Sequence, residues 1–451
     1  MKPSIPKGTR DFGPFESARR EYIFDTIKST FKKYGYAPLE TPSFENSSTL
    51  MGKYGDEGDQ LIFKILNSGD YLANVNNDIL QNKDSKKALS QISEKALRYD
   101  LTVPFARYVS MNHGQLVFPF KRYQIQAVWR ADRPQKGRYR EFVQCDADSI
   151  GSTSLLNEVE LVDMTQEVFS NLGIEVLIKI NNRKILSGIA EIINEPEKII
   201  SITVTLDKLD KIGEEAVITE MLNKGVSADA IEKLKPVLQF KGDTAAKISF
   251  LRNYLSKSEI GLKGVEELEF IFSNCNASNL EVDITLARGL NYYTGAIFEV
   301  KVNDPKSTFT GSISGGGRYD DLTGMFGLKN MSGVGISYGA DRIYDVLEEL
   351  KLFPSEETSS VKVLVVNFGG AEEKHALNLL RTLRHNNISA ELYPEASKMK
   401  KQLDYADRKK IPFALLAGSE EIASGNYSLK DLRSGEQKKL NINEIIQSIN
   451  I

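Results

Sequence analysis

Residues 129–148 read WRADRPQKGRYREFVQCDAD and form the most informative stretch of this 451-residue sequence. Between Arg130 and Arg140, five cationic side chains surround a single carboxylate, Asp132, and a proline and a glycine favour a loop. That much positive charge does not suit a core strand. Guanidinium groups bind phosphate and carboxylate oxygens through two parallel hydrogen bonds, so arginines on paired strands can hold a triphosphate and an acid together. The alternative is a solvated, charged hairpin, because runs of charge are usually exposed.

Length and composition place the chain among folded, multidomain proteins. At roughly 150 residues per domain, the chain should hold about three domains, and 41% hydrophobic residues are enough for buried cores. No apolar run approaches the roughly 20 residues of a membrane span, and residues 1–13 lack a signal-peptide core. We therefore expect a cytoplasmic protein that has no membrane partner.

The residues available for chemistry exclude several kinds of site. Cys145 and Cys275 are far apart in the sequence, so neither a disulfide framework nor a thiolate zinc site is supported. His113, His375 and His385 are scattered, which argues against a histidine-based triad or a His-x-x-x-His metal site. The sequence also has no P-loop and no strand-linked G-x-G-x-x-G. Carboxylates, arginines and the backbone are left to carry the chemistry.

The region before the arginine-rich loop mixes helix and strand. Residues 17–34 repeat apolar side chains at a spacing of four and predict an amphipathic helix. Residues 37–44 predict a strand that contains Pro42, which is typical of an edge or an interface. Residues 61–73 predict a hairpin, and the polar residues 74–95 predict a surface loop with some helix.

A long helical region follows the arginine-rich loop. A helix over 155–172 and a strand over 176–181 precede it. Residues 193–276 then have strong 3.6-residue periodicity and no chemical cluster, so we expect a separate helical insertion. Residues 282–288 and 296–302 predict two further strands that are joined as a hairpin.

The last part of the chain has the pattern of a separate α/β unit. A linker is expected at 352–360, and strands alternate with helices after it, which implies a largely parallel sheet. Residues 361–451 carry 14 Lys and Arg against 11 Asp and Glu, a net charge of +3, so −6 remains for residues 1–360. The basic helix at 398–410 predicts phosphate contacts with nucleic acid, and the alternative is a solvated helix face.

Further motifs, in order along the chain, give the sequence a family resemblance. Four stretches resemble the motifs of class II aminoacyl-tRNA synthetases. They are KGTRDF near the start, a helix and strand after it, residues 129–148, and GVGISYGADRI at 333–343. LARGLNYYTG at 286–295 and SGGGRYDDL at 314–322 are similar to the two signature peptides of histidyl-tRNA synthetases. The chain as a whole therefore resembles that family.

The resemblance implies an α+β protein. Residues 1–355 would form the class II catalytic domain, an antiparallel sheet with the helical insertion at about 193–276. Residues 361–451 would form an α/β anticodon-binding domain. The implied reaction is ATP-dependent ligation of L-histidine to tRNA(His) through a histidyl-adenylate, with release of AMP and pyrophosphate. Mg²⁺ is the implied cofactor, and the implied assembly is a homodimer, for which the apolar face of the first helix is the support in the sequence.

The resemblance also assigns roles to single residues. The catalytic cations are Arg130, Arg288 and Arg342. The histidine-binding residues are Asp100, Thr102, Arg130, Gln144, Asp148, Arg288, Tyr293 and Tyr319. The ATP-binding residues are Arg130, Asp132, Arg138, Phe142 and Arg342. The remaining assignments are Glu299 as a ligand of Mg²⁺, and Gln135, Lys136 and Arg138 as contacts of the tRNA.

Two departures from the family pattern and two alternatives stay open. Asn291 stands where the signature peptide usually has Asp, and the stretch 74–95 is longer than the usual connection. One alternative is a non-catalytic regulatory subunit of ATP phosphoribosyltransferase, although the C-terminal part and the arginine-rich loop argue against it. The other is a class II synthetase for threonine, proline or glycine, against which the two histidine peptides argue.

Overall fold

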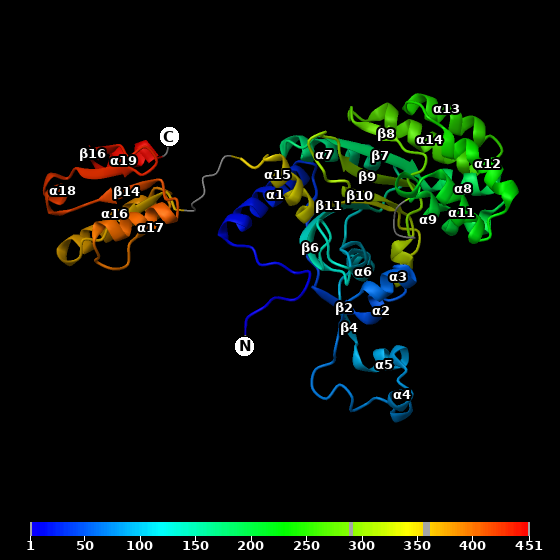
Figure 1. Ribbon diagram of the computed structural model, residues 1–451, viewed down its shortest axis with the longest axis horizontal. Coiled ribbons are helices and arrows are strands. Elements are labelled where there is room, and N and C mark those ends of the chain that lie inside the picture. The colour runs from blue at the N-terminus through cyan, green and yellow to red at the C-terminus, as the bar shows by residue number, and fades with distance from the viewer. Residues whose placement is uncertain (1, 288–291, 355–360, 450–451) are drawn as a thin grey trace. The chain divides into compact units, whose positions relative to one another are not determined.

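The computed structural model describes residues 2–287, 292–354 and 361–449 (Figure 1). The chain divides into two compact units, Met1–Leu352 and Phe353–Ile451, called here the N-terminal and the C-terminal unit. Among the described residues, no helix combines the length and the apolar character that a membrane crossing requires.

The N-terminal unit is built on an eight-stranded sheet. Its strands follow the order β1 (Ala37–Pro38), β5 (Phe120–Trp129), β6 (Glu141–Ile150), β11 (Gly333–Gly339), β10 (Ser312–Tyr319), β9 (Ala296–Val302), β7 (Val176–Asn182) and β8 (Leu280–Val282). All neighbours pair antiparallel except the two outer pairs, β1 with β5 and β7 with β8. The predicted α+β fold with an antiparallel catalytic sheet is therefore confirmed.

Two long helices, α1 (Pro14–Lys33) and α7 (Leu156–Asn171), cover one face of this sheet. The Phe31 ring of α1 lies 5.6 Å from the Tyr123 ring of β5 and 5.8 Å from the Tyr338 ring of β11. Phe169 of α7 reaches the same Tyr338 ring at 5.8 Å. The helix predicted at 17–34 is confirmed, but its apolar face is buried within the chain and gives no support to a dimer.

The opposite face of β5 and β6 is polar. Successive side chains of a strand point to opposite faces, so Arg122 points away from the helices that Tyr123 contacts. The register of the β5–β6 pair then places three polar pairs directly across from each other: Arg122 with Asp148, Gln124 with Asp146, and Gln126 with Gln144. This ladder is the floor on which the candidate site is built.

A helical layer lies between β7 and β8 in the sequence (Figure 1). It consists of α8 (Arg183–Ile192), η1 (Pro196–Lys198), α9 (Ile199–Leu206), α10 (Leu209–Ile212), α11 (Glu214–Asn223), α12 (Ala228–Gln239), α13 (Thr244–Tyr254) and α14 (Glu259–Asn274). Glycines allow α8 and α14 to meet, because a Cβ on Gly188 would lie 2.6 Å from the Cα of Gly261. Residues 193–276 of the predicted insertion thus continue a layer that begins with α8.

A second, three-stranded sheet contradicts two local predictions. It pairs β2 (Phe44–Asn46) and β3 (Lys64–Ile65) with β4 (Lys95–Leu97), so residues 61–73 do not form a hairpin of their own. Pro42 lies between β1 and β2 rather than in a strand, and its carbonyl accepts from the buried Arg98 at 3.1 Å. A buried guanidinium needs several hydrogen-bond acceptors, and supplying them takes precedence over the strand that the local sequence pattern predicts.

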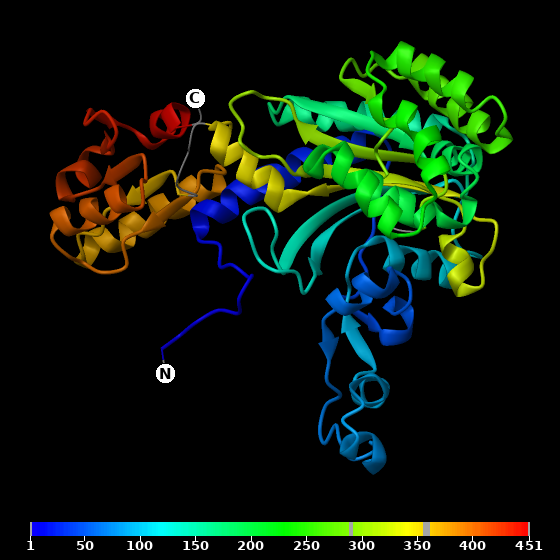
Figure 2. The ribbon, with the colours of Figure 1, turned by 45° about the vertical axis from the view of Figure 1, so that its right-hand side comes forward.

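The remaining helices complete the N-terminal unit. They are α2 (Ser47–Leu50), α3 (Gly55–Leu61), α4 (Asn77–Gln81), α5 (Ser85–Ile92), α6 (Thr102–Asn112), η2 (Leu322–Phe326) and α15 (Ala340–Leu350). The segment that carries α4 and α5 extends away from the sheet (Figure 2). It contains helix inside the predicted surface loop at 74–95.

The predicted hairpin between residues 282–288 and 296–302 is wrong. β8 and β9 both pair with β7, from opposite sides, so they are not neighbours. Asp283 directly follows β8, and its carboxylate accepts from Lys179 of β7 at 2.7 Å and from the Thr285 hydroxyl at 2.8 Å. This turn takes the chain out of the sheet before it returns as β9.

The C-terminal unit has a five-stranded sheet. Its order is β13 (Ala390–Leu392), β12 (Val363–Val365), β14 (Phe413–Leu416), β15 (Tyr427–Asp431) and β16 (Gln437–Leu440). The helices are α16 (Gly370–His385), α17 (Met399–Arg408), α18 (Ser419–Ser424) and α19 (Ile442–Ile449). The parallel pairing of β12 with β13 and β14 is as predicted, and β15 and β16 add a terminal antiparallel hairpin.

Candidate active site

A cavity of about 1020 Å³ opens in the N-terminal unit beside the loop that joins β5 and β6. Strands β6, β9, β10 and β11 and the start of α15 supply its walls. Ten of the predicted site residues line it: Arg130, Asp132, Gln135, Lys136, Arg138, Phe142, Gln144, Tyr293, Glu299 and Arg342. Residues that the sequence separates by more than 200 positions therefore share one space.

The arginine-rich loop is a closed structure. The Arg130 amide donates to the Arg140 carbonyl at 2.9 Å, and Gln135 and Arg138 exchange two backbone hydrogen bonds near the tip. The Arg138 guanidinium forms an ion pair with Asp132 at 2.9 Å. At the base of the loop, the Arg140 amide donates to the carbonyl of Gly8. The KGTRDF segment thus holds the base of the loop in place.

Arg130 lies between two aromatic rings. Its guanidinium carbon is 4.3 Å from the centre of the Tyr99 ring and 5.2 Å from that of Phe142, and Nε donates to the Tyr99 carbonyl at 3.1 Å. No partner of its two terminal nitrogens is found among the described residues. A cation held this way can bind two oxygens of a ligand at once.

Arg342 connects three parts of the cavity wall. It lies in the first turn of α15, its Nε donates to the Gly137 carbonyl at 2.9 Å, and its Nη1 donates to the Ser312 carbonyl at 2.7 Å. Next to it, the buried carboxylate of Asp341 accepts from the Val143 amide at 2.8 Å and forms ion pairs with Arg10 and Arg20. The N-terminal segment, α1 and α15 are thereby fixed against β6.

Below the cavity, the predicted histidine-binding residues form a buried polar cluster. Asp100 accepts from the Tyr54 hydroxyl at 2.9 Å and from the Val103 amide at 3.1 Å. Burial raises the pKa of the Asp100 carboxyl, and the hydrogen bond from Val103 and the nearby Arg130 oppose this rise. Thr102 begins α6 and lies near the Tyr292 hydroxyl.

Several buried acceptors of this region have no hydrogen-bond partner among the described residues. They include Oδ2 of Asp100 and Oε1 of Gln144, whose amide nitrogen donates to the Ser337 hydroxyl at 2.7 Å. A buried acceptor without a donor is unfavourable, so such atoms favour a ligand that brings hydrogen-bond donors. An ammonium group, with three donors and a positive charge, meets that requirement.

The second half of the cluster surrounds Asp148. Tyr319 donates to Oδ1 of its carboxylate at 2.6 Å, and Arg122 forms an ion pair with Oδ2 at 2.8 Å. Glycine is required opposite, because a Cβ on Gly335 would lie 2.0 Å from Asp148. Tyr293 joins this cluster to the cavity, and burial, followed by the charge of Asp148, raises the pKa of its hydroxyl.

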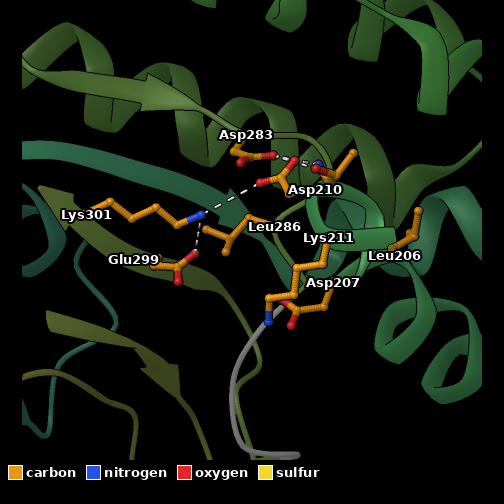
Figure 3. Close-up of a pocket in the computed structure, with 9 residues that line it drawn as sticks. Leu206, Asp207, Asp210, Lys211, Asp283, Leu286, Glu299 and Lys301 are labelled. Atoms are coloured by element: carbon orange, nitrogen blue, oxygen red, sulfur yellow. Dashed lines mark hydrogen bonds and ion pairs between the residues drawn. The ribbon is translucent and has the colours of Figure 1, made fainter. Parts of the chain in front are cut away.

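Glu299 of β9 faces the cavity and a smaller pocket beside it (Figure 3). Lys301 of the same strand lies between Glu299, at 4.0 Å, and Asp210 of the helical layer, at 3.7 Å. Among the described residues, no three His, Cys, Asp or Glu side chains are placed to hold a metal ion. Mg²⁺ is usually bound by one or two carboxylates together with substrate phosphates, so Glu299 fits as such a ligand.

The comparisons with known proteins agree with this geometry. A sequence model described as histidyl-tRNA synthetase matches residues 87–343, more than half of the chain, and one described as anticodon-binding domain matches residues 362–450. The chain belongs to the histidyl-tRNA synthetase family.

Relatives of this family match the chain over nearly its full length. The histidine–tRNA ligase of Christiangramia forsetii is 60% identical over 449 residues, which cover 98% of each chain. That of Phocaeicola vulgatus is 58% identical and covers 99% of this chain and 98% of its own. The crystal structure of histidyl-tRNA synthetase from Nostoc sp. PCC 7120 superposes with a TM-score of 0.83 at 31% identity, covering 100% of this chain and 99% of that one.

Two residues of the histidyl-tRNA synthetase resemblance cannot be placed. Arg288 and Asn291 lie in the segment 288–291, outside the described residues. The role predicted for Arg288 at the α-phosphate, and the effect of Asn291 in place of Asp, stay predictions. The segment connects to Tyr292 and Tyr293, which are described and belong to the site.

Several residues of the site were missed in the sequence. They are Arg122, which forms ion pairs with Asp146 and Asp148, Asp146 itself, and Tyr99, whose ring lies against Arg130. The alternation of polar side chains at 122, 124 and 126, and at 144, 146 and 148, could have revealed Arg122 and Asp146, because it marks a polar face of a strand. Asp207 and Lys211 of the helical layer also line the cavity, and no motif in the sequence indicates them.

Proposed function

We propose that this chain catalyses ATP-dependent ligation of L-histidine to tRNA(His) through a histidyl-adenylate, with release of AMP and pyrophosphate. Membership of the histidyl-tRNA synthetase family supports this reaction. The observation that carries it is the pair of buried acceptors, Asp100 Oδ2 and Gln144 Oε1, next to a cavity that also contains Arg130 and Arg342. An amino acid and a nucleoside triphosphate can thus bind side by side.

In the first step, a carboxylate oxygen of histidine attacks the α-phosphorus of ATP, and the bond to pyrophosphate breaks. Negative charge grows on the α-phosphate as this happens, and fixed cations stabilise it without any protein nucleophile. Arg130 is the cation for the α-phosphate and the carboxylate, Phe142 stacks on adenine, and Arg342 binds the γ-phosphate. Asp132 and Arg138 hold the loop that completes the ATP site, and Arg288 adds a further cation at the α-phosphate.

The amino-acid side of the site binds histidine at both ends. Asp100, Thr102 and Gln144 accept from its ammonium group, whereas Tyr293, Tyr319 and Asp148 provide the polar partners of its imidazole. Burial and the charge of Asp148 raise the pKa of the Tyr319 hydroxyl, which therefore stays protonated and keeps its proton for donation. The two nitrogens of an imidazole need a donor and an acceptor, and this cluster offers both.

Mg²⁺ would be held by Glu299 together with the phosphates of ATP. When bound, it neutralises charge on the phosphate oxygens. The buried carboxylate of Glu299 lines the same cavity as the arginine-rich loop, which is a suitable position for that ion.

In the second step, the 3′-hydroxyl of the terminal adenosine of tRNA(His) attacks the carbonyl of the adenylate, and AMP leaves. Gln135, Lys136 and Arg138 at the tip of the loop contact the acceptor end of the tRNA. We assign residues 1–355 to catalysis and 361–451 to anticodon binding, and we expect a homodimer in solution. Light scattering coupled to gel filtration tests the assembly.

Pyrophosphate exchange into ATP, measured with each of the twenty amino acids, tests the proposed reaction. We expect exchange with histidine alone and aminoacylation of tRNA(His) with the same preparation. Histidine binding without any exchange would instead indicate a regulatory paralogue. Exchange with threonine, proline or glycine but not histidine would overturn the assigned specificity.

A further inference from the structure

The end of strand β12 in the C-terminal unit is fixed by a buried amide network. The Asn367 amide donates to Oε1 of Gln402 at 2.8 Å, and Nε2 of Gln402 donates back to the Asn367 carbonyl at 2.7 Å. Gln402 also donates to the Ser397 carbonyl, and Asn367 to the carbonyl of Tyr393. Because both amides are buried and fully engaged, the backbone before residue 368 is held rigidly against α17.

This network fixes the position of an aromatic ring that is exposed to solvent. Phe368 follows Asn367 directly and exposes 43% of its surface. Met399 exposes 45% and lies three positions before Gln402, on the same face of α17. Gly369, the next residue, approaches the segment before α17 closely: its φ of +80° suits glycine, and a Cβ there would lie 2.9 Å from Ala396. Phe368 and Met399 are the exposed large apolar side chains of the described part of this unit.

Charged side chains of both signs surround this ring. Glu395 pairs with Lys401 at 3.8 Å, Glu372 accepts from Ser419 at 2.6 Å, and Glu373 accepts from the Asn367 side chain at 3.2 Å. Lys398 and Lys400, on either side of Met399, are exposed, and neither has a carboxylate partner among the described residues. Two uncompensated lysines thus flank the apolar pair.

We propose that Phe368, with Met399 beside it, is a stacking platform for an unpaired base of the tRNA anticodon loop, and that Lys398 and Lys400 bind the flanking phosphates. A rigid exposed ring next to cations is how proteins bind single-stranded nucleic acid, because every base has a stacking face. A protein partner would also cover apolar side chains, but it would not require unpaired lysines on both sides. This inference rests on the proposed function, and it assigns the contact to named residues.

The test uses the full-length protein and a tRNA(His) transcript. Stacking on an aromatic ring contributes about 1–3 kcal/mol per base, so Phe368→Ala should raise KM for tRNA(His) roughly 5- to 150-fold. Histidine-dependent pyrophosphate exchange, which needs no tRNA, should be unchanged, as should kcat of aminoacylation. Phe368→Trp should restore KM, because indole stacks at least as well. An unchanged KM in Phe368→Ala would overturn the proposal.

The lysines have a matched control on the same unit. Lys398→Ala and Lys400→Ala should each weaken tRNA binding and reduce its dependence on salt, whereas Lys439→Ala, exposed on β16, should do neither. Equal effects of all three would mean that only net charge matters.

Transcripts with single abasic nucleotides in the anticodon loop identify the stacked base. Removing that base should weaken wild-type binding and abolish the further effect of Phe368→Ala, whereas the substitution should still act with the other transcripts. If Phe368→Ala weakens every transcript equally, the ring does not stack on a base. Absence of exchange in the wild-type protein would contradict the proposed function itself, which is a separate outcome.

Discussion

The Tyr319 hydroxyl donates a 2.6 Å hydrogen bond to Oδ1 of Asp148, and both side chains are almost completely buried. Arg122, from the strand next to that of Asp148, holds the other oxygen at 2.8 Å. The carboxylate is thus oriented from two sides before any ligand arrives. Such preorganisation is what a site needs if histidine is to be distinguished from other amino acids by its imidazole.

Removing that hydrogen bond should impair histidine recognition selectively. In Tyr319→Phe, Asp148 loses a buried donor, and hydrogen bonds to charged groups contribute about 1.5–3 kcal/mol, so KM for histidine should rise roughly 10- to 100-fold. KM for ATP should stay unchanged in the exchange assay. Tyr338→Phe is the control, because its hydroxyl contacts Thr165 in the core, away from the cavity. Parallel rises in both KM values would argue for a general loss of structure.

Replacing Asp100 should separate activity from stability. Burial raises the pKa of its carboxyl, so this group stabilises the fold below its unfolded pKa, and that contribution is lost as the pH rises through the folded pKa. In Asp100→Asn, we therefore expect a free energy of unfolding at neutral pH that is equal to or higher than that of the wild type, with KM for histidine roughly 10- to 100-fold higher.

Urea unfolding at several pH values measures this effect. The wild type should lose stability from this group between acid and neutral pH, and Asp100→Asn should lose less. Asp25→Asn, at an exposed position on α1, should follow the wild type in both assays. A strongly destabilised Asp100→Asn protein would show that the buried carboxylate supports the fold.

Arg130→Lys should slow adenylate formation although the charge is kept. An ammonium cannot bind the Tyr99 carbonyl and two ligand oxygens together, which the planar guanidinium can. Loss of a fixed group that stabilises the growing charge lowers kcat about 100- to 1000-fold. Arg133→Lys, exposed on the same loop, should leave exchange intact. Single-turnover measurement of the adenylate detects the difference, and equal rates in both variants would remove Arg130 from the chemistry.

Deleting residues 361–451 should affect the two half-reactions unequally. The C-terminal unit has its own hydrophobic core, so its removal leaves the core of the N-terminal unit intact. We expect exchange within about twofold of the full chain, and a fall in kcat/KM for tRNA(His) of at least about 100-fold, since many phosphate contacts are lost together. Equal losses in both assays would instead give the C-terminal unit a structural role.

The sequence predicted the arginine-rich loop well because its signal is local. Five cations around a proline and a glycine cannot be buried, and the loop they form is the one in the structure. The residues of the histidine pocket came only from family resemblance, since a single Asp100 or Tyr319 has no local pattern that separates a ligand from a core residue. Their proximity depends on the order of the strands in the sheet.

The errors in the fold arose where partners are distant along the chain. Residues 282–288 and 296–302 look like a hairpin, but β7, about 100 positions earlier, separates them. Likewise, β3 pairs with β4 rather than with the residues that directly follow it in the sequence. Local strand patterns give no information on such pairing, because register and partner are set by burial in the complete sheet. Asp207 and Lys211 were missed for the same reason.

The ion pair between Arg10 and Asp341 joins two residues that are 331 positions apart. A ribosome that adds 5 to 20 residues per second needs roughly 20 to 70 s to make the chain between them. Throughout that interval, the KGTRDF segment, α1 and the arginine-rich loop exist without the helix that fixes them. The catalytic centre is therefore among the last parts of the N-terminal unit to be completed during synthesis, and a chain that stops short of residue 341 cannot assemble it.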